Sequence, residues 1–161
     1  MSKIKEVLND DESVLVFDID GVLAVMEWGE YTHYGEDDET WTKMYENNTN
    51  FYTEDFVCKR MQEFLKDKDK SKIYVITKAF CKNEEEDKKN FVNTFYGIPK
   101  EHVYAVKNNL DKTGVLINIK KEYPGLSEHK LVMIDDTVEV LTDIMEKTGF
   151  STAHISSFLD K

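Results

Sequence analysis

Two carboxylates directly follow an apolar run near the start of the chain, and their spacing points to chemistry. The segment from Val14 to Gly21 reads VLVFDIDG. Four consecutive apolar residues are typical of a strand buried on both faces in a parallel sheet. Because side chains alternate along an extended chain, Asp18 and Asp20 project to the same side, and Gly21 permits a turn after them. The sequence therefore predicts two acids at the carboxyl end of a buried strand, where open parallel sheets bind ligands.

A second acid pair, Asp135 and Asp136, follows the apolar run from Leu131 to Ile134. If the two strands are neighbours, up to four carboxylates meet at one edge of the sheet. Two like charges about 4 Å apart cost about 4 kcal/mol at an effective dielectric constant near 20, so such a cluster is expected to hold a cation or a proton. An oxygen-only ligand set favours Mg²⁺, which also shares substrate phosphate.

Further polar residues fall at the same predicted edge. Thr77 closes the run from Lys72 to Ile76 and would offer a hydroxyl and backbone amides to a phosphate oxygen, so we expect Thr77 and the adjacent Lys78 to bind substrate. Lys112, near the start of the helix before the Asp135 strand, would bring positive charge to the acids and to a transferring phosphoryl group. Lys107, at a strand end, is the alternative for this role, and the sequence leaves the choice open.

The elements that must position these residues alternate along the chain. Five apolar runs predict strands, and amphipathic patterns between them predict helices, so we expect an α/β fold: a single Rossmann-like three-layer domain over residues 1–161 with a five-stranded parallel sheet. Asn83 and Glu86 resemble a capping box, and Gly149 suits a helix end. One helix face is predicted to contain Val138, Leu141, Ile144 and Met145. The predicted strands are 14–17, 72–76, 102–106, 130–134 and 151–155.

Residues 25–52 break this alternation with an aromatic and acidic segment that is too short for its own core. Because it follows the Asp18 strand, we expect a flap or small lid above the site. Trp28 and Tyr31 would then approach the leaving group and bind substrate. Such aromatic side chains either stack on a base or sugar, which would favour a nucleotide monophosphate, or cover the sheet edge, and both interpretations stay open.

The formal net charge of −11 and a pI near 4.8 oppose binding to nucleic acid or anionic lipid. No stretch approaches the roughly 20 apolar residues of a membrane span, and the first residues carry no apolar run before charges appear, so we expect a cytoplasmic protein without membrane contact. Cys58 and Cys81 lack metal-type spacing and are predicted to be reduced thiols. A small phosphorylated substrate is the expected partner, and the oligomeric state stays open.

The order of these residues resembles the four motifs of the haloacid dehalogenase-like (HAD) phosphohydrolase superfamily, and the resemblance spans nearly the whole chain. The first motif, DIDGVL from Asp18 to Leu23, is specific, and the acid pair of the fourth is moderately so. A single Thr and a single Lys identify the family only weakly, and Thr77 and Lys112 support it mainly because they lie in the expected order between the first and fourth motifs. A response-regulator receiver uses similar residue types in a different order. The intervals before and after Thr77 leave no room for a full cap domain, so the resemblance is to a small-cap or capless phosphatase.

The resemblance implies that Asp18 is a nucleophile forming an aspartyl-phosphate and that Asp20 is the general acid and base. It also implies that Mg²⁺ is held by the Asp18 carboxylate, the Asp20 backbone carbonyl and Asp135, with Asp136 as a ligand directly or through water. Thr77 and Lys112 complete the catalytic set. An acid at position 20 favours the phosphatase branch, hence a magnesium-dependent phosphomonoesterase acting on a nucleotide or another small phosphorylated metabolite. The alternatives are a catalytically idle phosphate-binding or regulatory protein of the same fold, and a nucleic-acid end phosphatase.

Overall fold

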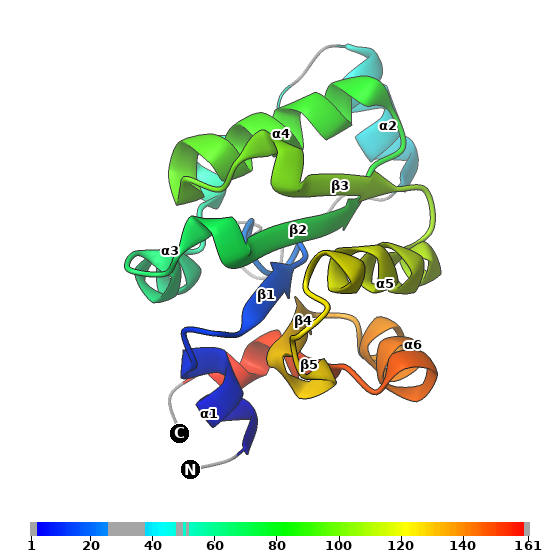
Figure 1. Ribbon diagram of the computed structural model, residues 1–161. Helices are drawn as coiled ribbons and strands as arrows, with labels where there is room; N and C mark the ends of the chain where they lie inside the picture. The colour runs from blue at the N-terminus through cyan, green and yellow to red at the C-terminus, as the bar shows by residue number, and fades with distance from the viewer. Residues whose placement is uncertain (1–2, 26–37, 48–49, 51, 160–161) are drawn as a thin grey trace.

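The structure is a computed structural model that describes residues 3–25, 38–47, 50 and 52–159 of the chain. Its centre is a sheet of five parallel strands in the order β3-β2-β1-β4-β5 (Figure 1). This confirms the predicted α/β fold with a five-stranded parallel sheet. The strands are β1 (Val14–Phe17), β2 (Ile73–Lys78), β3 (Val103–Val106), β4 (Leu131–Asp135) and β5 (Ser151–His154).

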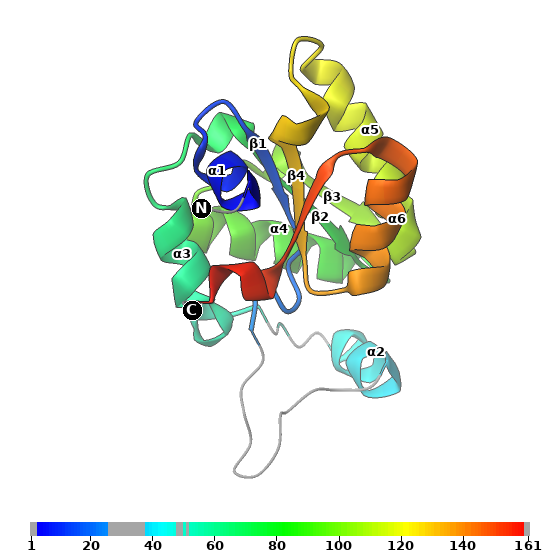
Figure 2. The same cartoon turned by 90° about the horizontal axis from the view of Figure 1, so that it is seen from below.

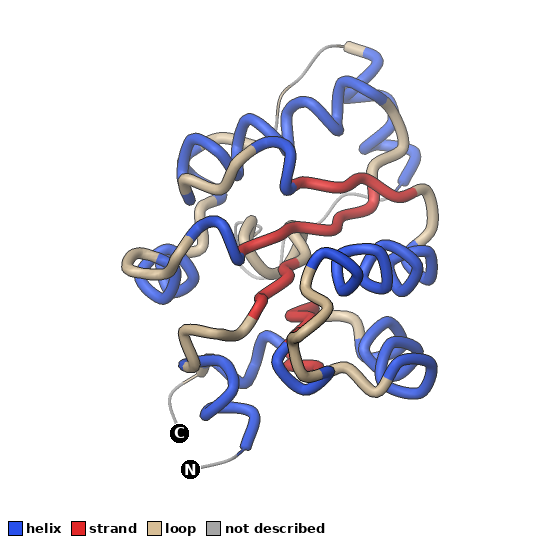
Figure 3. The backbone as a smooth tube through the Cα atoms, in the orientation of Figure 1, coloured by secondary structure: helices blue, strands red, loops and turns tan. Residues whose placement is uncertain are grey.

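Helices cover both faces of the sheet, which gives the three layers that the sequence predicts (Figures 1 and 3). Helices α1, α3 and α4 pack on the face that contains Leu15 and Phe17, whereas α5 and α6 pack on the face that contains Val14 and Val16. All four β1 side chains are buried, as expected for a central strand with a helix layer on each side. The helices are α1 (Lys3–Asn9), α2 (Asp38–Glu46), α3 (Lys59–Leu65), α4 (Lys82–Tyr96), α5 (Lys112–Glu122) and α6 (Val138–Thr148).

Strand register brings the two acid pairs to one edge. Phe17 of β1 pairs with Val75 of β2 on one side and with Ile134 of β4 on the other. Asp18 and Asp135 therefore stand at the same level, one residue beyond Phe17 and Ile134, and the Asp18 amide donates to the Ile134 carbonyl at 2.9 Å. The prediction that these two strands are neighbours is confirmed.

One local prediction about a helix is wrong, and the structure departs in part from another. Helix α4 begins at Lys82 after Cys81, whose sulfur accepts from the Glu84 amide, so Asn83 lies inside the helix and forms no capping box with Glu86. The Glu84 carboxylate accepts the Phe80 amide at 2.8 Å and so satisfies a backbone donor ahead of the helix. The other departure concerns the apolar face of α6, which the structure buries only in part.

Helix α6 exposes both ends of the predicted apolar stripe. Val138 is 66% exposed and Met145 is 54% exposed, while Val140, Leu141 and Ile144 are buried. The face that meets the sheet is thus rotated toward Val140. Packing against the sheet determines this rotation, and the sequence pattern alone does not reveal it. Gly149 ends the helix with φ +72°, as predicted.

The segment between β1 and α3 contributes helix α2, which lies on the side of the sheet where the strands end (Figure 2). Trp28 and Tyr31 lie outside the described residues. Cys58 and Cys81 are both free and partly buried. In the part of the chain that the structure describes, no helix is both long and apolar enough to cross a membrane.

Candidate active site

Asp18 is buried at the carboxyl end of β1, and its charge is offset by a buried lysine. The side chain of Lys112, at the first residue of α5, is 1% exposed and places Nζ 3.0 Å from Asp18 Oδ2 and 2.8 Å from Asp135 Oδ2. Burial alone would lower the pKa of Lys112, but the two carboxylates outweigh that effect and raise it, so Lys112 stays charged. A single ammonium group thus bridges the ends of the two central strands.

The second oxygen of Asp18 has no such contact. Asp18 Oδ1 is buried without a hydrogen-bond partner among the residues that the structure describes. Burial raises the pKa of Asp18 to about 7; Lys112 opposes this rise and Asp135 adds to it. A buried polar atom without a partner is costly in a stable fold, so it marks a place where a ligand would bind.

Asp135 and Asp136 complete a group of three carboxylates with Asp18. One oxygen from each residue can be chosen so that all three lie within 4.8 Å of one another. Asp135 is fully buried, and its Oδ1 accepts the Thr137 amide at 2.8 Å. The backbone oxygen of Asp136 lies 3.0 Å from His154 Nε2 at the end of β5. These contacts fix the β4 end of the group.

The three-carboxylate group fits a hard divalent cation. Its donors are all carboxylate oxygens, one from each of the three residues. Mg²⁺ takes one or two protein carboxylates and keeps waters or phosphate oxygens in its other positions, which suits a half-open cluster. Gly21 leaves room for this arrangement: with φ +77° it has no side chain, and a Cβ there would lie 2.2 Å from Asp136 Oδ2.

The Asp20 carboxylate is not part of this group of three carboxylates. Asp20 Oδ1 accepts from the Tyr52 hydroxyl at 2.7 Å, and Oδ2 accepts from Lys88 Nζ at 2.8 Å. Both side-chain oxygens of Asp20 thus accept hydrogen bonds from protein donors, and the metal ligand expected from Asp20 is its backbone carbonyl. Asp20 and Asp18 thus have separate lysine partners.

Thr77 and Lys78 end β2 beside the acids. Phe17, the last residue of β1, pairs with Val75, and Thr77 follows Val75 by two residues toward the same end of the sheet. The Thr77 side chain is buried and Lys78 is exposed. Lys107 donates to the carbonyls of Ala79 and Phe80, at 3.2 Å and 2.9 Å. Of the two lysines that the sequence leaves open, only Lys112 contacts the acids in the structure.

Aromatic side chains of α2 pack onto the start of α4. The rings of Tyr45 and Phe80 meet edge to face at 5.8 Å, and Trp41 donates from Nε1 to Glu84 Oε1 at 3.3 Å. Trp41 also packs against Tyr52 at 6.2 Å. These described α2 aromatics therefore contact the turn before α4, Glu84 of α4 and Tyr52. The substrate contacts predicted for Trp28 and Tyr31 concern residues that the structure does not describe.

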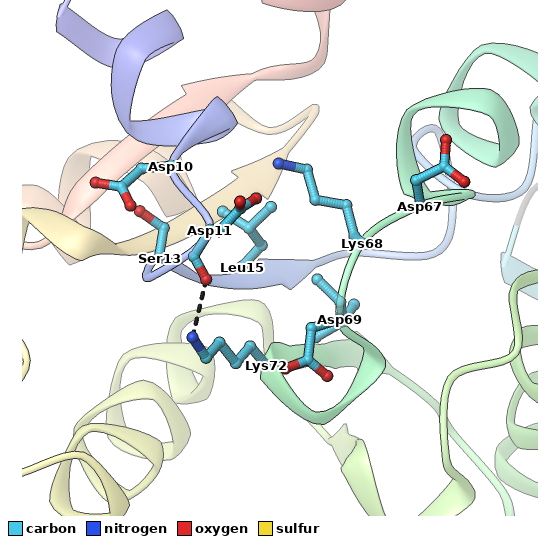
Figure 4. A pocket seen from close by; sticks show the side chains of 9 residues that line it. Asp10, Asp11, Ser13, Leu15, Asp67, Lys68, Asp69 and Lys72 are labelled. Atoms are coloured by element: carbon cyan, nitrogen blue, oxygen red, sulfur yellow. Dashed lines mark hydrogen bonds between the residues drawn. The ribbon is translucent and has the colours of Figure 1, made fainter.

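A cavity of about 360 Å³ lies at the opposite end of the sheet, where β1 and β2 begin (Figure 4). Lys68 donates to the Leu8 carbonyl and Lys72 to the Asp11 carbonyl, each at 2.9 Å. Both ammonium groups therefore bind backbone oxygens at and after the end of α1. None of the predicted site residues lines this cavity.

Lys88 is the site residue that the motif pattern does not reveal. It lies on α4, contacts Asp20 and Glu84, and is 1% exposed. The signal for it is its spacing: position 88 falls on the same helical face as Phe91 and Val92, which are buried. A lysine in an apolar stripe must find a charged partner, and this pattern could have drawn attention to it.

Two of the solved structures that are similar to this chain can be named. One is described as DsGPDH of Dunaliella salina, with a TM-score of 0.57 and 12% identity over 94% of this chain and 25% of that chain. The other is the HAD domain of the effector protein Lem4 from Legionella pneumophila, with a TM-score of 0.47 and 14% identity over 88% of this chain and 84% of that one. This chain spans about a quarter of the length of DsGPDH. Neither protein-family models nor curated proteins give a match.

Proposed function

We propose that this chain, which has the HAD-like fold, is a magnesium-dependent phosphomonoesterase that works through an aspartyl-phosphate on Asp18. The observation that carries the proposal is the state of the Asp18 carboxylate. One oxygen is held by Lys112 at 3.0 Å, and the other is buried without a hydrogen-bond partner among the described residues. An oriented carboxylate with one open oxygen suits in-line attack on phosphorus.

In the first step an Asp18 oxygen forms a bond to phosphorus while the bond from phosphorus to the leaving oxygen breaks. Asp20 gives its proton to that leaving oxygen. In the second step water attacks phosphorus, the bond from phosphorus to Asp18 breaks, and Asp20 takes the proton of the water. Phosphate is released and both acids return to their starting states.

Lys112 and the metal ligands lower the electrostatic barrier to this attack. Lys112 keeps its positive charge beside the nucleophile and offsets part of the repulsion between a carboxylate and a phosphate dianion. Asp18, Asp135, Asp136 and the Asp20 backbone carbonyl would hold Mg²⁺, which supplies further positive charge and orients the phosphate oxygens. Thr77 and Lys78 would contact the remaining phosphate oxygens.

The substrate in this proposal is a small phosphorylated metabolite, with a nucleotide monophosphate as one form. The net charge of −11 opposes extended contact with nucleic acid. Trp28 and Tyr31 would contact the leaving group from residues 25–52. We also retain the cytoplasmic location that the sequence predicts.

A panel of phosphate esters tests the proposal. With Mg²⁺ present, the wild-type chain should release inorganic phosphate from at least one ester, and Asp18→Asn should lower turnover by about 10³-fold or more, as nucleophile removal typically does. Asp11→Asn is the matched control, because Asp11 is exposed at the opposite end of β1. An Asp18→Asn variant that keeps most of its activity would contradict the nucleophile role. Phosphate binding without turnover of any ester would favour the idle regulatory protein.

A further inference from the structure

Lys88 lies at the centre of a buried charged cluster outside the three-carboxylate group. Its Nζ is 2.8 Å from Asp20 Oδ2 and 2.8 Å from Glu84 Oε1, and it also donates to the Lys78 carbonyl. Its three partners come from the turn after β1, from α4 and from the end of β2. Each of them accepts one hydrogen bond from the ammonium group, which has three to donate.

Tyr52 contacts the same carboxylate from another segment. Its hydroxyl donates to Asp20 Oδ1 at 2.7 Å, and its ring packs on Phe91 at 5.7 Å and lies 5.5 Å from Lys88 Nζ. Tyr52 is 5% exposed. Both Asp20 oxygens are therefore held by buried donors from two different elements, although the Asp20 side chain itself is 37% exposed.

Attachment of α4 to the sheet does not require this buried charged cluster. Burying an ammonium group costs several kcal/mol unless its partners are well placed, and apolar residues of similar size often stabilise a fold at least as well. Phe91 and Val92 already pack this face of α4 against the sheet. What the charged cluster adds is a fixed orientation of a half-exposed carboxylate, which would otherwise rotate toward solvent.

We propose that Lys88 and Tyr52 are positioning residues that hold the Asp20 carboxylate at the leaving oxygen of the substrate. This rests on the proposed phosphatase function, in which the Asp20 proton passes to the leaving oxygen as the bond from that oxygen to phosphorus breaks. Proton transfer needs the donor and acceptor within hydrogen-bond reach, and a displacement of about 1 Å costs about 10²-fold in rate.

Substrates with different leaving groups distinguish a positioning role for Lys88 and Tyr52 from a purely structural one. An alkyl oxygen is a poor leaving group and needs the Asp20 proton, whereas p-nitrophenolate leaves without it. If Lys88 and Tyr52 position Asp20, their loss should impair β-glycerol phosphate far more than p-nitrophenyl phosphate. The quantity to compare is kcat/KM, because it reports the steps up to the first phosphoryl transfer rather than later hydrolysis of the intermediate.

The variants are Tyr52→Phe, which removes only the hydroxyl, and Lys88→Met, which keeps a chain of similar length. We expect each to lower kcat/KM on β-glycerol phosphate by about 10- to 100-fold and on p-nitrophenyl phosphate by less than about threefold. Lys89→Met is the matched control on the same helix, because Lys89 pairs with Glu85 and contacts no site residue in the structure. It should leave both values unchanged.

An Asp20→Asn background completes the test. Asp20→Asn should show the same dependence on the leaving group, and Tyr52→Phe added to it should cause no further loss. Equal losses on both substrates, or a further loss in the Asp20→Asn background, would overturn the positioning role. If Lys88→Met does not fold, the Tyr52→Phe comparison decides alone. A wild-type chain that hydrolyses neither ester under any metal condition would instead overturn the proposed function, and the inference with it.

Discussion

Asp18 is a carboxylate in the protein interior beside a second carboxylate, and its burial raises its pKa to about 7. Such a group binds more protons in the folded state than in the unfolded chain, where its pKa is near 3.8. The free energy of unfolding of the metal-free protein should therefore fall as the pH rises from about 4 to about 7 through this residue. An ionised Asp18 in this metal-free site therefore lowers the stability of the fold.

The first prediction follows from this fall in the free energy of unfolding with rising pH. In the absence of metal, Asp18→Asn should unfold at a higher temperature than wild type at pH 8, because it removes an unfavourable charge worth about 1 to 4 kcal/mol. Near pH 4.5 the two proteins should converge, since Asp18 is then protonated in the folded wild-type protein. Thermal unfolding followed by circular dichroism at both pH values measures this. A variant less stable than wild type at pH 8 would contradict the prediction.

At the residue scale, the sequence predicts the acids better than their partners. Asp18 and Asp135 follow apolar runs, so strand pattern and spacing are enough to bring them together, as the register bears out. Lys88 belongs to no motif, and its contact with Asp20 depends on how α4 packs against the turn after β1. No local pattern contains that information. The same holds for Tyr52, whose hydroxyl reaches Asp20 from across the segment between β1 and α3.

At the scale of elements, the turn after β1 and the loop after β4 share one small space. Gly21 has φ +77°, which favours glycine, and a Cβ at this position would lie 2.2 Å from Asp136 Oδ2. A side chain there would therefore strain the turn and displace a carboxylate of the acid group. The sequence predicts the turn, but it does not reveal that Asp136 occupies the space beside it.

Gly21→Ala should lower the free energy of unfolding by about 1 to 2 kcal/mol and weaken Mg²⁺ binding, because Asp136 must move away. The matched control is Gly114→Ala in α5, where no atom of the described residues lies within 4 Å of the new Cβ, outside the helix backbone and the adjacent residues. That change should stabilise the helix by about 0.5 to 1 kcal/mol. Urea unfolding and calorimetric Mg²⁺ titration measure the two effects. Unchanged Mg²⁺ binding by Gly21→Ala would remove Asp136 from the metal site.

At the scale of the whole molecule, the sequence predicts the layers well because five apolar runs alternate with amphipathic patterns. The adjacency of β1 and β4 follows from the acids, whose strand ends must meet, whereas the sequence does not predict the places of β2, β3 and β5. The buried face of α6 is less predictable, since Val138 and Met145 fit an apolar stripe but remain exposed. The helix orients toward the sheet through Val140, Leu141 and Ile144, and that rotation depends on the tertiary contact rather than on spacing.

Metal binding should stabilise the whole fold, because the ligands come from both central strands. At a Mg²⁺ concentration about 100 times Kd, the free energy of unfolding should rise by about 2.7 kcal/mol, which corresponds to about 5 to 10 °C in Tm. A chain with a net charge of −11 also attracts cations without a specific site. Asp135→Asn should therefore abolish the rise, while Asp69→Asn, at the opposite end of the sheet, should preserve it. A rise that survives Asp135→Asn would indicate nonspecific screening.

The position of β1 between β2 and β4 has a consequence for synthesis of the protein. The ribosome produces β1 more than a hundred residues before its partner on one side, which begins at Leu131. Until β4 has been made, the nascent chain therefore carries a strand of four apolar residues with one edge unpaired. Such edges promote aggregation of incomplete chains, and pairing across long sequence separations is slow. The yield of folded protein should consequently depend more on how well this strand is shielded on the ribosome than on the stability of the finished sheet.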